Sequence, residues 1–226
     1  KWFAHFYQWI LEIKKIDPKQ TIMVGISYGG GIMLKTLLSI QNKVLLPKAL
    51  LTYGTYSDAE STMKFWLSGE ISFGGKTYQK TPNEWGLIVL FHNYLKNIET
   101  DWNTSDLERA IQLQIQDKSK ECELQVNKLP EFQRKIFNSI ITGNPTSEVK
   151  ELAEVMFKNE KKTLKNLSPK YWAKDFQRKI FILHGSNDSM IPFTESIQLA
   201  ETLPNSELFI SYLYEHSELS PNGGLL

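Results

Sequence analysis

The chain has 226 residues, of which 26 are Lys or Arg, 25 are Asp or Glu, one is Cys and 41% are hydrophobic. This length suits one domain or one domain with an insertion, and the apolar fraction excludes a disordered protein. A net charge of +1 gives no electrostatic case for binding nucleic acid or an anionic membrane. No apolar run approaches the ~20 residues of a membrane-spanning helix. A lone cysteine excludes an internal disulfide and favours a reducing, cytoplasmic compartment.

The patterns at both ends indicate that the sequence is a piece of a longer protein. Residues 1–16 have the pattern of an amphipathic helix that ends before Pro18, and neither an initiator Met nor a leader precedes them. The apolar positions of this helix are Trp2, Phe6, Trp9, Ile10, Ile13 and Ile16. At the other end, residues 221–226 (PNGGLL) finish the sequence without a closing helix or strand.

Alternating strands and helices predict a doubly wound α/β sheet. The expected strands are residues 21–26, 49–53, 179–183 and 207–212, and the expected helices include residues 32–40 and 194–202. The strands are nearly continuous apolar runs, which are typical of a parallel sheet that is buried on both faces.

Between these two stretches lies an inserted, mainly helical module. A hairpin is expected over residues 70–79, and Thr81-Pro82-Asn83-Glu84 has the form of a helix start whose helix runs through Tyr94. Further helical stretches are expected at residues 103–128, 131–142 and 147–163. The aromatic side chains near the start of the module form either an apolar lid over a substrate group or the module's own core, and we prefer the core. These are Phe65, Trp66, Phe73, Tyr78, Trp85, Phe91, Tyr94 and Trp102.

The sharpest chemical feature is Gly25-Ile26-Ser27-Tyr28-Gly29, which lies between an expected strand and an expected helix. A sharp strand-to-helix turn presents a serine hydroxyl to a base, and the glycines indicate a turn too tight for side chains two positions either side. The N–H of Tyr28 is then a candidate oxyanion donor at the helix start. A glycine-rich turn without catalysis is the alternative. A phosphate-binding loop is excluded, because Lys and Ser or Thr do not follow Gly30.

A nucleophilic serine needs a base, and the chain has four histidines. His5 and His92 lie in expected helices, and His184 lies at a strand end, four residues before an acid. His216 follows the last expected strand, and ligands of open α/β sheets bind at the carboxyl ends of strands. His216 is therefore the candidate base, by position and by elimination.

The serine and histidine also need a carboxylate that orients the imidazole. Asp188 lies in a glycine-containing turn directly after the expected strand at residues 179–183, and it is the candidate acid. The alternative is a turn aspartate that caps the next helix. Asp58, just after the strand at residues 49–53, is the substitute acid if Asp188 is structural.

No group of His, Cys and carboxylate residues has metal-ligand spacing, so we expect neither a metal nor a cofactor. Cys122 lies between Glu121 and Glu123, and acidic neighbours disfavour a thiolate. We therefore expect Cys122 to have no chemical role. A nucleotide-dependent α/β protein is a further alternative, but the motifs that it requires are missing.

Together these motifs resemble the α/β-hydrolase superfamily. The matching pieces are Gly25-Ile26-Ser27-Tyr28-Gly29, His184-Gly185-Ser186-Asn187-Asp188 with Ile191-Pro192, and His216. The resemblance implies a mostly parallel sheet flanked by helices, with residues 1–58 and 170–226 as hydrolase core and residues 59–169 as a helical cap. It also implies Ser27 as nucleophile, His216 as general base and then acid, and Asp188 as the orienting carboxylate.

The sequence departs from the family before the nucleophile. The family has several strands there, and the loop after its third strand supplies the second oxyanion donor. Only one helix and one strand are expected before Ser27, so the remaining strands and the second donor are expected to lie outside this sequence. Loss of such a donor costs about 10²–10³ in rate.

The resemblance implies a serine hydrolase that acts by acyl transfer. The expected substrate is a small carboxylic ester with an apolar group, because the motifs show no feature specific to peptides or thioesters. We expect neither a nucleic-acid partner nor a transmembrane segment. A non-catalytic binding protein of the same fold, and an acyltransferase that uses the same triad, remain alternatives.

Overall fold

The computed structural model describes residues 1–213, 215 and 216. Residues 221–226, interpreted above as an unfinished end, lie outside the described residues. The chain divides into two compact units. One comprises Lys1–Thr62 and Lys165–Leu226, and the other is Met63–Leu164.

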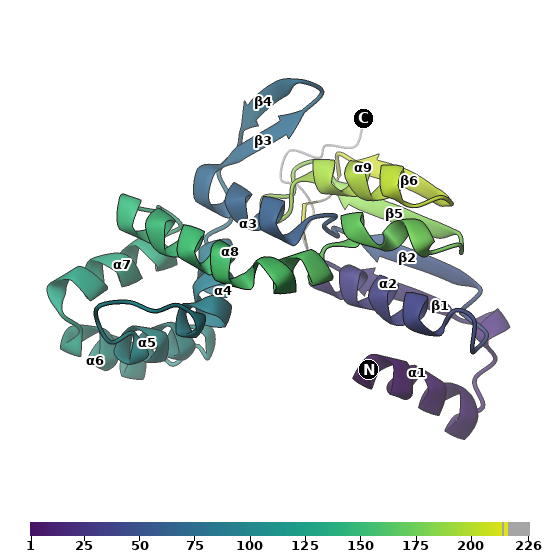
Figure 1. The fold of residues 1–226 in the computed structure, drawn as a ribbon, viewed down its shortest axis with the longest axis horizontal. Helices are drawn as coiled ribbons and strands as arrows, with labels where there is room; N and C mark the ends of the chain where they lie inside the picture. The colour runs from purple at the N-terminus through teal and green to yellow at the C-terminus, as the bar shows by residue number, and fades with distance from the viewer. Residues whose placement is uncertain (214, 217–226) are drawn as a thin grey trace. The chain divides into compact units, whose positions relative to one another are not determined.

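The first unit is built on a four-stranded sheet in the order β1-β2-β5-β6 (Figure 1). The strands are β1 (Ile22–Ile26), β2 (Ala49–Tyr53), β5 (Ile180–Gly185) and β6 (Ser206–Ser211). All three neighbouring pairs are parallel. Helices α2 (Tyr28–Ile40) and α9 (Phe193–Thr202) connect strands and pack on the sheet. The predicted α/β class is confirmed. The predicted strands agree with the observed bounds to within one residue, except that β5 continues two residues beyond its predicted end at residue 183.

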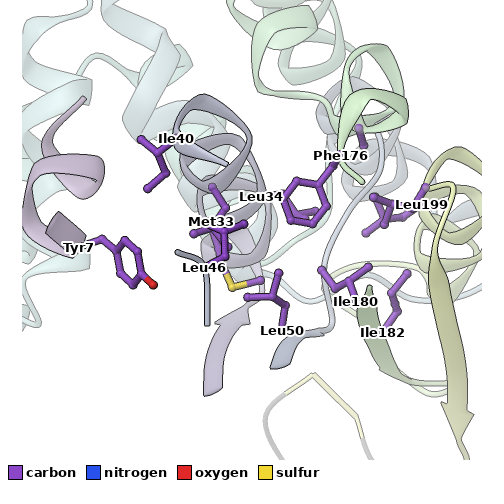
Figure 2. Packing of buried hydrophobic residues seen from close by; sticks show 13 residues of the cluster. Tyr7, Met33, Leu34, Ile40, Leu46, Leu50, Phe176, Ile180, Ile182 and Leu199 are labelled. Carbon is purple, nitrogen blue, oxygen red and sulfur yellow. The ribbon is translucent and has the colours of Figure 1, made fainter. Parts of the chain in front are cut away.

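The core of this unit lies on one face of the sheet, where α2 and α9 cover it. Leu50, Ile180 and Ile182 point from the strands into this core and are 1%, 0% and 1% exposed. They pack with Leu34 from α2 and Leu199 from α9, as Figure 2 shows. Alternate residues of a strand point to opposite faces, so this packing fixes which side chains face the helices.

The opposite face of the sheet is open in the part of the chain that the structure describes. Ile22, Val24 and Ile26 of β1 are 67%, 49% and 60% exposed, and Phe209 of β6 is 64% exposed. The prediction of strands buried on both faces is therefore wrong for the described residues. An apolar strand sequence indicates what could be buried, and the number of helices that pack on the sheet decides what is buried.

Helix α1 (Trp2–Ile13) forms where the periodicity predicts a helix, but its apolar stripe is not buried. Tyr7 is the buried side chain of α1, and its hydroxyl donates to the Leu45 carbonyl over 2.8 Å. Trp2, Phe6 and Trp9 remain 67%, 44% and 43% exposed and stack on one another. A short 3₁₀ turn (Pro18–Gln20) then leads into β1, and Asp17 caps it.

The chain leaves the first unit through α3 (Ala59–Ser68) and returns through α8 (Ser147–Leu167). The second unit contains the hairpin of β3 (Glu70–Phe73) and β4 (Lys76–Gln79), the helices α4 (Trp85–Tyr94), α5 (Ser105–Ile115), α6 (Ser119–Lys128) and α7 (Glu131–Ile141), and a 3₁₀ turn (Leu95–Asn97). Two further 3₁₀ turns, Pro169–Tyr171 and Ala173–Asp175, follow α8 in the first unit. The predicted hairpin and mainly helical character are both observed.

Two helix predictions in the second unit need correction. Helix α4 begins at Trp85 instead of directly after Thr81, because Asn83 is the residue whose side chain accepts from the Trp85 N–H, at 3.0 Å. The single stretch predicted for residues 103–128 is two helices, since Asp117 adopts a left-handed conformation (φ 55°) that ends α5. Aspartate tolerates this conformation better than most residues, and helical periodicity does not reveal it.

The aromatic residues of the second unit divide between core and surface. Phe65, Trp66 and Phe91 are 2%, 7% and 0% exposed and belong to the core, as preferred from sequence. Phe73 and Trp85 are 41% and 43% exposed. The spacing of these aromatic residues in the sequence did not indicate which of them are buried. Within residues 1–213, 215 and 216, none of the helices combines the length and apolar character needed to cross a bilayer.

Candidate active site

Ser27 sits at the turn between β1 and α2 in an uncommon backbone conformation, with φ 52° and ψ −129°. Non-glycine residues rarely adopt positive φ, and such strain persists only where surrounding contacts hold it. The Ser27 N–H donates to the Tyr53 carbonyl over 2.8 Å, and the Thr55 hydroxyl donates to the Ser27 carbonyl over 3.0 Å. The first contact comes from the last residue of the neighbouring strand β2 and the second from the loop directly after it, so this segment fixes the turn from its side.

The glycines around Ser27 have different roles from those expected. A Cβ atom at Gly25 would lie 2.5 Å from the Gly30 Cα, and one at Gly30 would lie 1.9 Å from Thr55 Oγ1. A Cβ atom at Gly29 would meet no atom within 4 Å. The crowding predicted at both flanking glycines is therefore found at Gly25 and not at Gly29. Gly30 is the second tight position, because Thr55, two residues after the end of β2, lies directly against it.

His216 lies between Ser27 and Asp188. Its Nε2 is 2.9 Å from Ser27 Oγ, and its Nδ1 is 2.7 Å from Asp188 Oδ2. A carboxylate accepts hydrogen bonds, so Nδ1 carries the proton, and Nε2 is free to accept from the serine hydroxyl. The structure thus brings together the three residues that sequence analysis named as nucleophile, base and acid.

Asp188 is buried, with 1% of its surface exposed, and both of its carboxylate oxygens have polar partners. Oδ1 accepts from the N–H groups of Met190 and Ile191, both at 2.8 Å. Burial alone would raise the pKa of Asp188, but hydrogen bonds from His184 and His216 outweigh it and lower the pKa to about 2. The carboxylate is therefore ionised at neutral pH despite its burial.

Three residues, the last of β2 and the two that follow it, support this geometry and were not singled out from the sequence. The Tyr53 hydroxyl donates to the carbonyl of Glu215 over 2.6 Å, which holds the backbone next to His216. Gly54 has φ 57°, and a Cβ atom there would lie 3.3 Å from Asp188 Oδ2 and 3.4 Å from His216 Nδ1. Thr55 braces the Ser27 carbonyl, as described above. Their position at the end of an apolar strand and directly after it was the available signal.

Asp58, the substitute acid, has other partners. Its Oδ2 pairs with the Lys170 ammonium group, and its Oδ1 accepts from the Ser168 hydroxyl over 3.1 Å. Glu195, itself buried, accepts from the Ser57 and Asp58 N–H groups at 2.9 and 2.7 Å. Asp58 therefore belongs to a polar network where the chain leaves and re-enters the first unit.

The structure also places the other residues that were singled out from the sequence. Tyr28 is the first residue of α2, so its N–H lies outside the helix's own hydrogen-bond ladder, and its ring stacks on Tyr56 with 5.9 Å between centroids. His5 and His92 are exposed on their helices. Cys122 is buried, contrary to its polar surroundings in sequence, and burial raises the pKa of its thiol. Over the described residues, no group of three or more His, Cys, Asp or Glu side chains is arranged to hold a metal ion.

Comparison with known proteins gives a likeness of fold. No protein-family model and no curated protein matches the chain. Among solved structures, it resembles an α/β fold family hydrolase from Bacillus anthracis, with 14% identity, 94% of this chain and 66% of that chain covered and a TM-score of 0.47. It also resembles a non-heme bromoperoxidase, described as putative, from Mycobacterium tuberculosis, with 12% identity, 94% and 65% coverage and a TM-score of 0.45.

A third similar structure is a mutant of the meta-cleavage product hydrolase CumD, with 17% identity, 94% and 63% coverage and a TM-score of 0.41. The chain thus spans 63–66% of the length of these three structures. At such identities the likeness concerns the fold and not the activity. The Bacillus anthracis structure is described as an α/β fold family hydrolase, which is the kind of protein that the motifs resemble.

Proposed function

We propose that this chain carries the catalytic residues of a serine hydrolase and cleaves a carboxylic ester through an acyl-enzyme on Ser27. The observation that carries the proposal is the continuous line of contacts from Ser27 Oγ through the His216 ring to Asp188 Oδ2, at 2.9 and 2.7 Å. Such a line lets a histidine remove the serine proton while a carboxylate stabilises the resulting imidazolium.

In the acylation step, Ser27 Oγ forms a bond to the ester carbonyl carbon as its proton passes to His216 Nε2. The carbonyl electrons move onto oxygen, and the Tyr28 N–H at the start of α2 is the proposed donor to that oxyanion. Collapse of the tetrahedral intermediate breaks the bond to the alcohol, which takes the proton from His216 Nε2. Asp188 stays ionised throughout and fixes the Nδ1–H tautomer.

In the deacylation step, the same groups act on water. His216 Nε2 removes a proton from a water molecule, and the resulting hydroxide attacks the acyl carbon. Ser27 Oγ leaves with the proton from His216, and the carboxylic acid is released. An alcohol that replaces water in this step would turn the hydrolase into an acyltransferase, so product analysis with and without added alcohol separates these two activities.

We also propose that residues 59–169 are an insertion in a hydrolase core made of residues 1–58 and 170–226. This is supported by the neck, which we define as Ser57–Ala59 together with Ser168–Lys170. Within it, the Lys170 N–H donates to the Ser57 carbonyl over 3.1 Å, and the Ala59 N–H donates to the Ser168 hydroxyl over 2.9 Å. Because the two crossings of the chain are directly hydrogen-bonded, a module could be inserted there without interrupting the sheet.

Hydrolysis of short-chain aryl esters by the full chain tests the proposed function. We expect measurable turnover in the wild type and loss of turnover in Ser27→Ala and His216→Gln. Thr36→Ala, a substitution elsewhere on α2, is the matched control and should keep wild-type turnover. A folded wild-type protein that hydrolyses no ester of the series, or a Ser27→Ala variant with undiminished turnover, would contradict the proposal.

A further inference from the structure

His184 is a fully buried histidine that the proposed mechanism does not use. It lies near the end of β5 with 0% of its surface exposed, four residues before Asp188. Its Nδ1 is 2.6 Å from Ser196 Oγ on α9, and its Nε2 is 2.9 Å from the Ile191 carbonyl. The same Nε2 is 3.2 Å from Asp188 Oδ2. Both ring nitrogens thus have defined polar partners.

These contacts determine where the His184 proton lies. The Ile191 carbonyl and the ionised Asp188 carboxylate are acceptors only, so Nε2 must carry a proton and be shared between them. The Ser196 hydroxyl can then donate to Nδ1, and its 2.6 Å contact with Nδ1 is shorter than its 3.2 Å contact with the Thr55 carbonyl. With a proton on Nε2 and the Ser196 hydroxyl directed at Nδ1, both ring nitrogens have a hydrogen-bond partner.

The result is that two imidazole rings donate to one carboxylate oxygen. Asp188 Oδ2 faces His216 Nδ1 at 2.7 Å and His184 Nε2 at 3.2 Å, while Oδ1 is held by the backbone. Among the described residues, His184 from β5 and His216 beyond β6 are the titratable groups that act on this carboxyl. With every acceptor direction occupied, the carboxylate cannot rotate away from His216 without breaking a hydrogen bond.

His184 also connects the acid to the turn that holds the nucleophile. Ser196, its partner on α9, lies 3.2 Å from the Thr55 carbonyl, and the Thr55 hydroxyl donates to the Ser27 carbonyl. Neighbouring residues therefore run from Asp188 through His184, Ser196 and Thr55 to the backbone of Ser27, but the single Ser196 proton that is donated to Nδ1 is not also donated to the Thr55 carbonyl.

We propose that His184 is a positioning residue for the catalytic acid: through its Nε2–H it holds Asp188 Oδ2 ionised and aimed at His216. The inference rests on the proposed function for its catalytic meaning, but the hydrogen bond is a property of the fold. His184 touches no reacting atom, so its removal should lower kcat and leave KM unchanged. Because a hydrogen bond to the charged form favours that form, its removal should also raise the pKa of Asp188.

Two substitutions of similar polarity separate positioning from simple packing. In His184→Gln the longer amide can place an N–H near the position of the imidazole Nε2, whereas in His184→Asn the amide reaches only as far as Nδ1. The Asp188 carboxyl is followed by its ¹³C resonance from pH 7 to below its folded-state pKa of about 2, and the resonance is assigned by its absence in Asp188→Asn. We expect His184→Asn to raise the midpoint by about one pH unit and to lower kcat severalfold, and His184→Gln to restore both.

A measurement on the wild type keeps the test decisive if a variant fails to fold. The ¹⁵N shifts of the His184 ring report its tautomer, and we expect the Nε2–H form at neutral pH. The Nδ1–H form would overturn the inference, as would an Asp188 midpoint that is equal in wild type, His184→Gln and His184→Asn. A protein that hydrolyses no ester while the Asp188 midpoint still depends on residue 184 overturns the proposed function and leaves the hydrogen bond established.

Discussion

Gly30→Ala is the substitution that most directly tests how the turn at Ser27 is held. The added Cβ atom would lie 1.9 Å from Thr55 Oγ1 and 2.8 Å from Thr55 Cβ, so Thr55 or the start of α2 must move. Overpacking of this kind costs about 1–3 kcal/mol, and losing the Thr55–Ser27 hydrogen bond adds about 0.5–1.5 kcal/mol. We therefore expect a loss of about 1.5–4.5 kcal/mol in the free energy of unfolding.

Gly29→Ala is the matched control, because it adds the same atom one residue earlier. A Cβ atom there meets nothing within 4 Å, and alanine favours a helix over glycine by up to about 1 kcal/mol. Urea unfolding should show Gly29→Ala at least as stable as wild type and Gly30→Ala clearly less stable. In the Gly30→Ala background, Thr55→Ala removes the two clashing side-chain atoms beyond Cβ and should recover part of the loss.

The same pair of variants reports on the nucleophile. Displacing Thr55 or α2 shifts the Ser27 backbone, and misplacement of a reacting group by about 1 Å can cost about 10²-fold in rate. Ester turnover should therefore fall strongly in Gly30→Ala and stay near wild type in Gly29→Ala. Equal stability and equal turnover in the two variants would refute the packing that we describe at the turn.

Three further predictions concern the acid and its surroundings. The pKa of Asp188, about 2, lies below its ordinary value of 3.8. As the pH falls from about 4 to 2, the free energy of unfolding should therefore decrease by about 2 kcal/mol more in wild type than in Asp188→Asn, as measured by urea unfolding. The ionised Asp188 stabilises the fold above its ordinary pKa of 3.8, and this stabilisation is lost as the pH falls through the folded-state pKa of about 2. The same pH dependence of the unfolding free energy in both proteins would contradict this. Asp188→Asn should lower kcat by about 10⁴-fold. Asp58→Asn should change kcat by no more than about threefold, because Asp58 pairs with Lys170. If Asp58→Asn lowered kcat more than Asp188→Asn did, Asp58 would be the catalytic acid. Gly54→Ala forces a side chain into a left-handed conformation beside Asp188 and His216, so it should cost about 1 kcal/mol or more in stability and lower kcat at least about tenfold.

Much of the fold follows from local sequence patterns. Short apolar strands alternating with helices predict a parallel sheet, and the four strands appear at the expected positions. Ser27, Asp188 and His216 each follow a strand, and the carboxyl ends of parallel strands lie along one edge of a sheet. That is why residues separated by up to 189 positions could be grouped from the sequence.

The features that sequence analysis missed depend on contacts between distant residues. The tightness at Gly30 comes from Thr55, two residues after the end of β2, and the role of His184 comes from its partners Ser196 and Ile191. Neither arrangement leaves a periodic signal. The exposed faces of α1 and β1 were missed for a related reason: apolar periodicity shows which side chains suit burial, and packing partners determine whether burial occurs.

Labelling of the full chain with a fluorophosphonate, located by peptide mass spectrometry, tests the central claim most directly. The reagent forms a stable bond only with a serine whose hydroxyl is activated by a base, so it reports on Ser27 and His216 before any substrate is known. We predict a single adduct on Ser27 that is lost in Ser27→Ala and forms far more slowly in His216→Gln. A folded wild-type protein that gives no adduct, or an adduct on another residue, would contradict the assignment of Ser27 as the nucleophile.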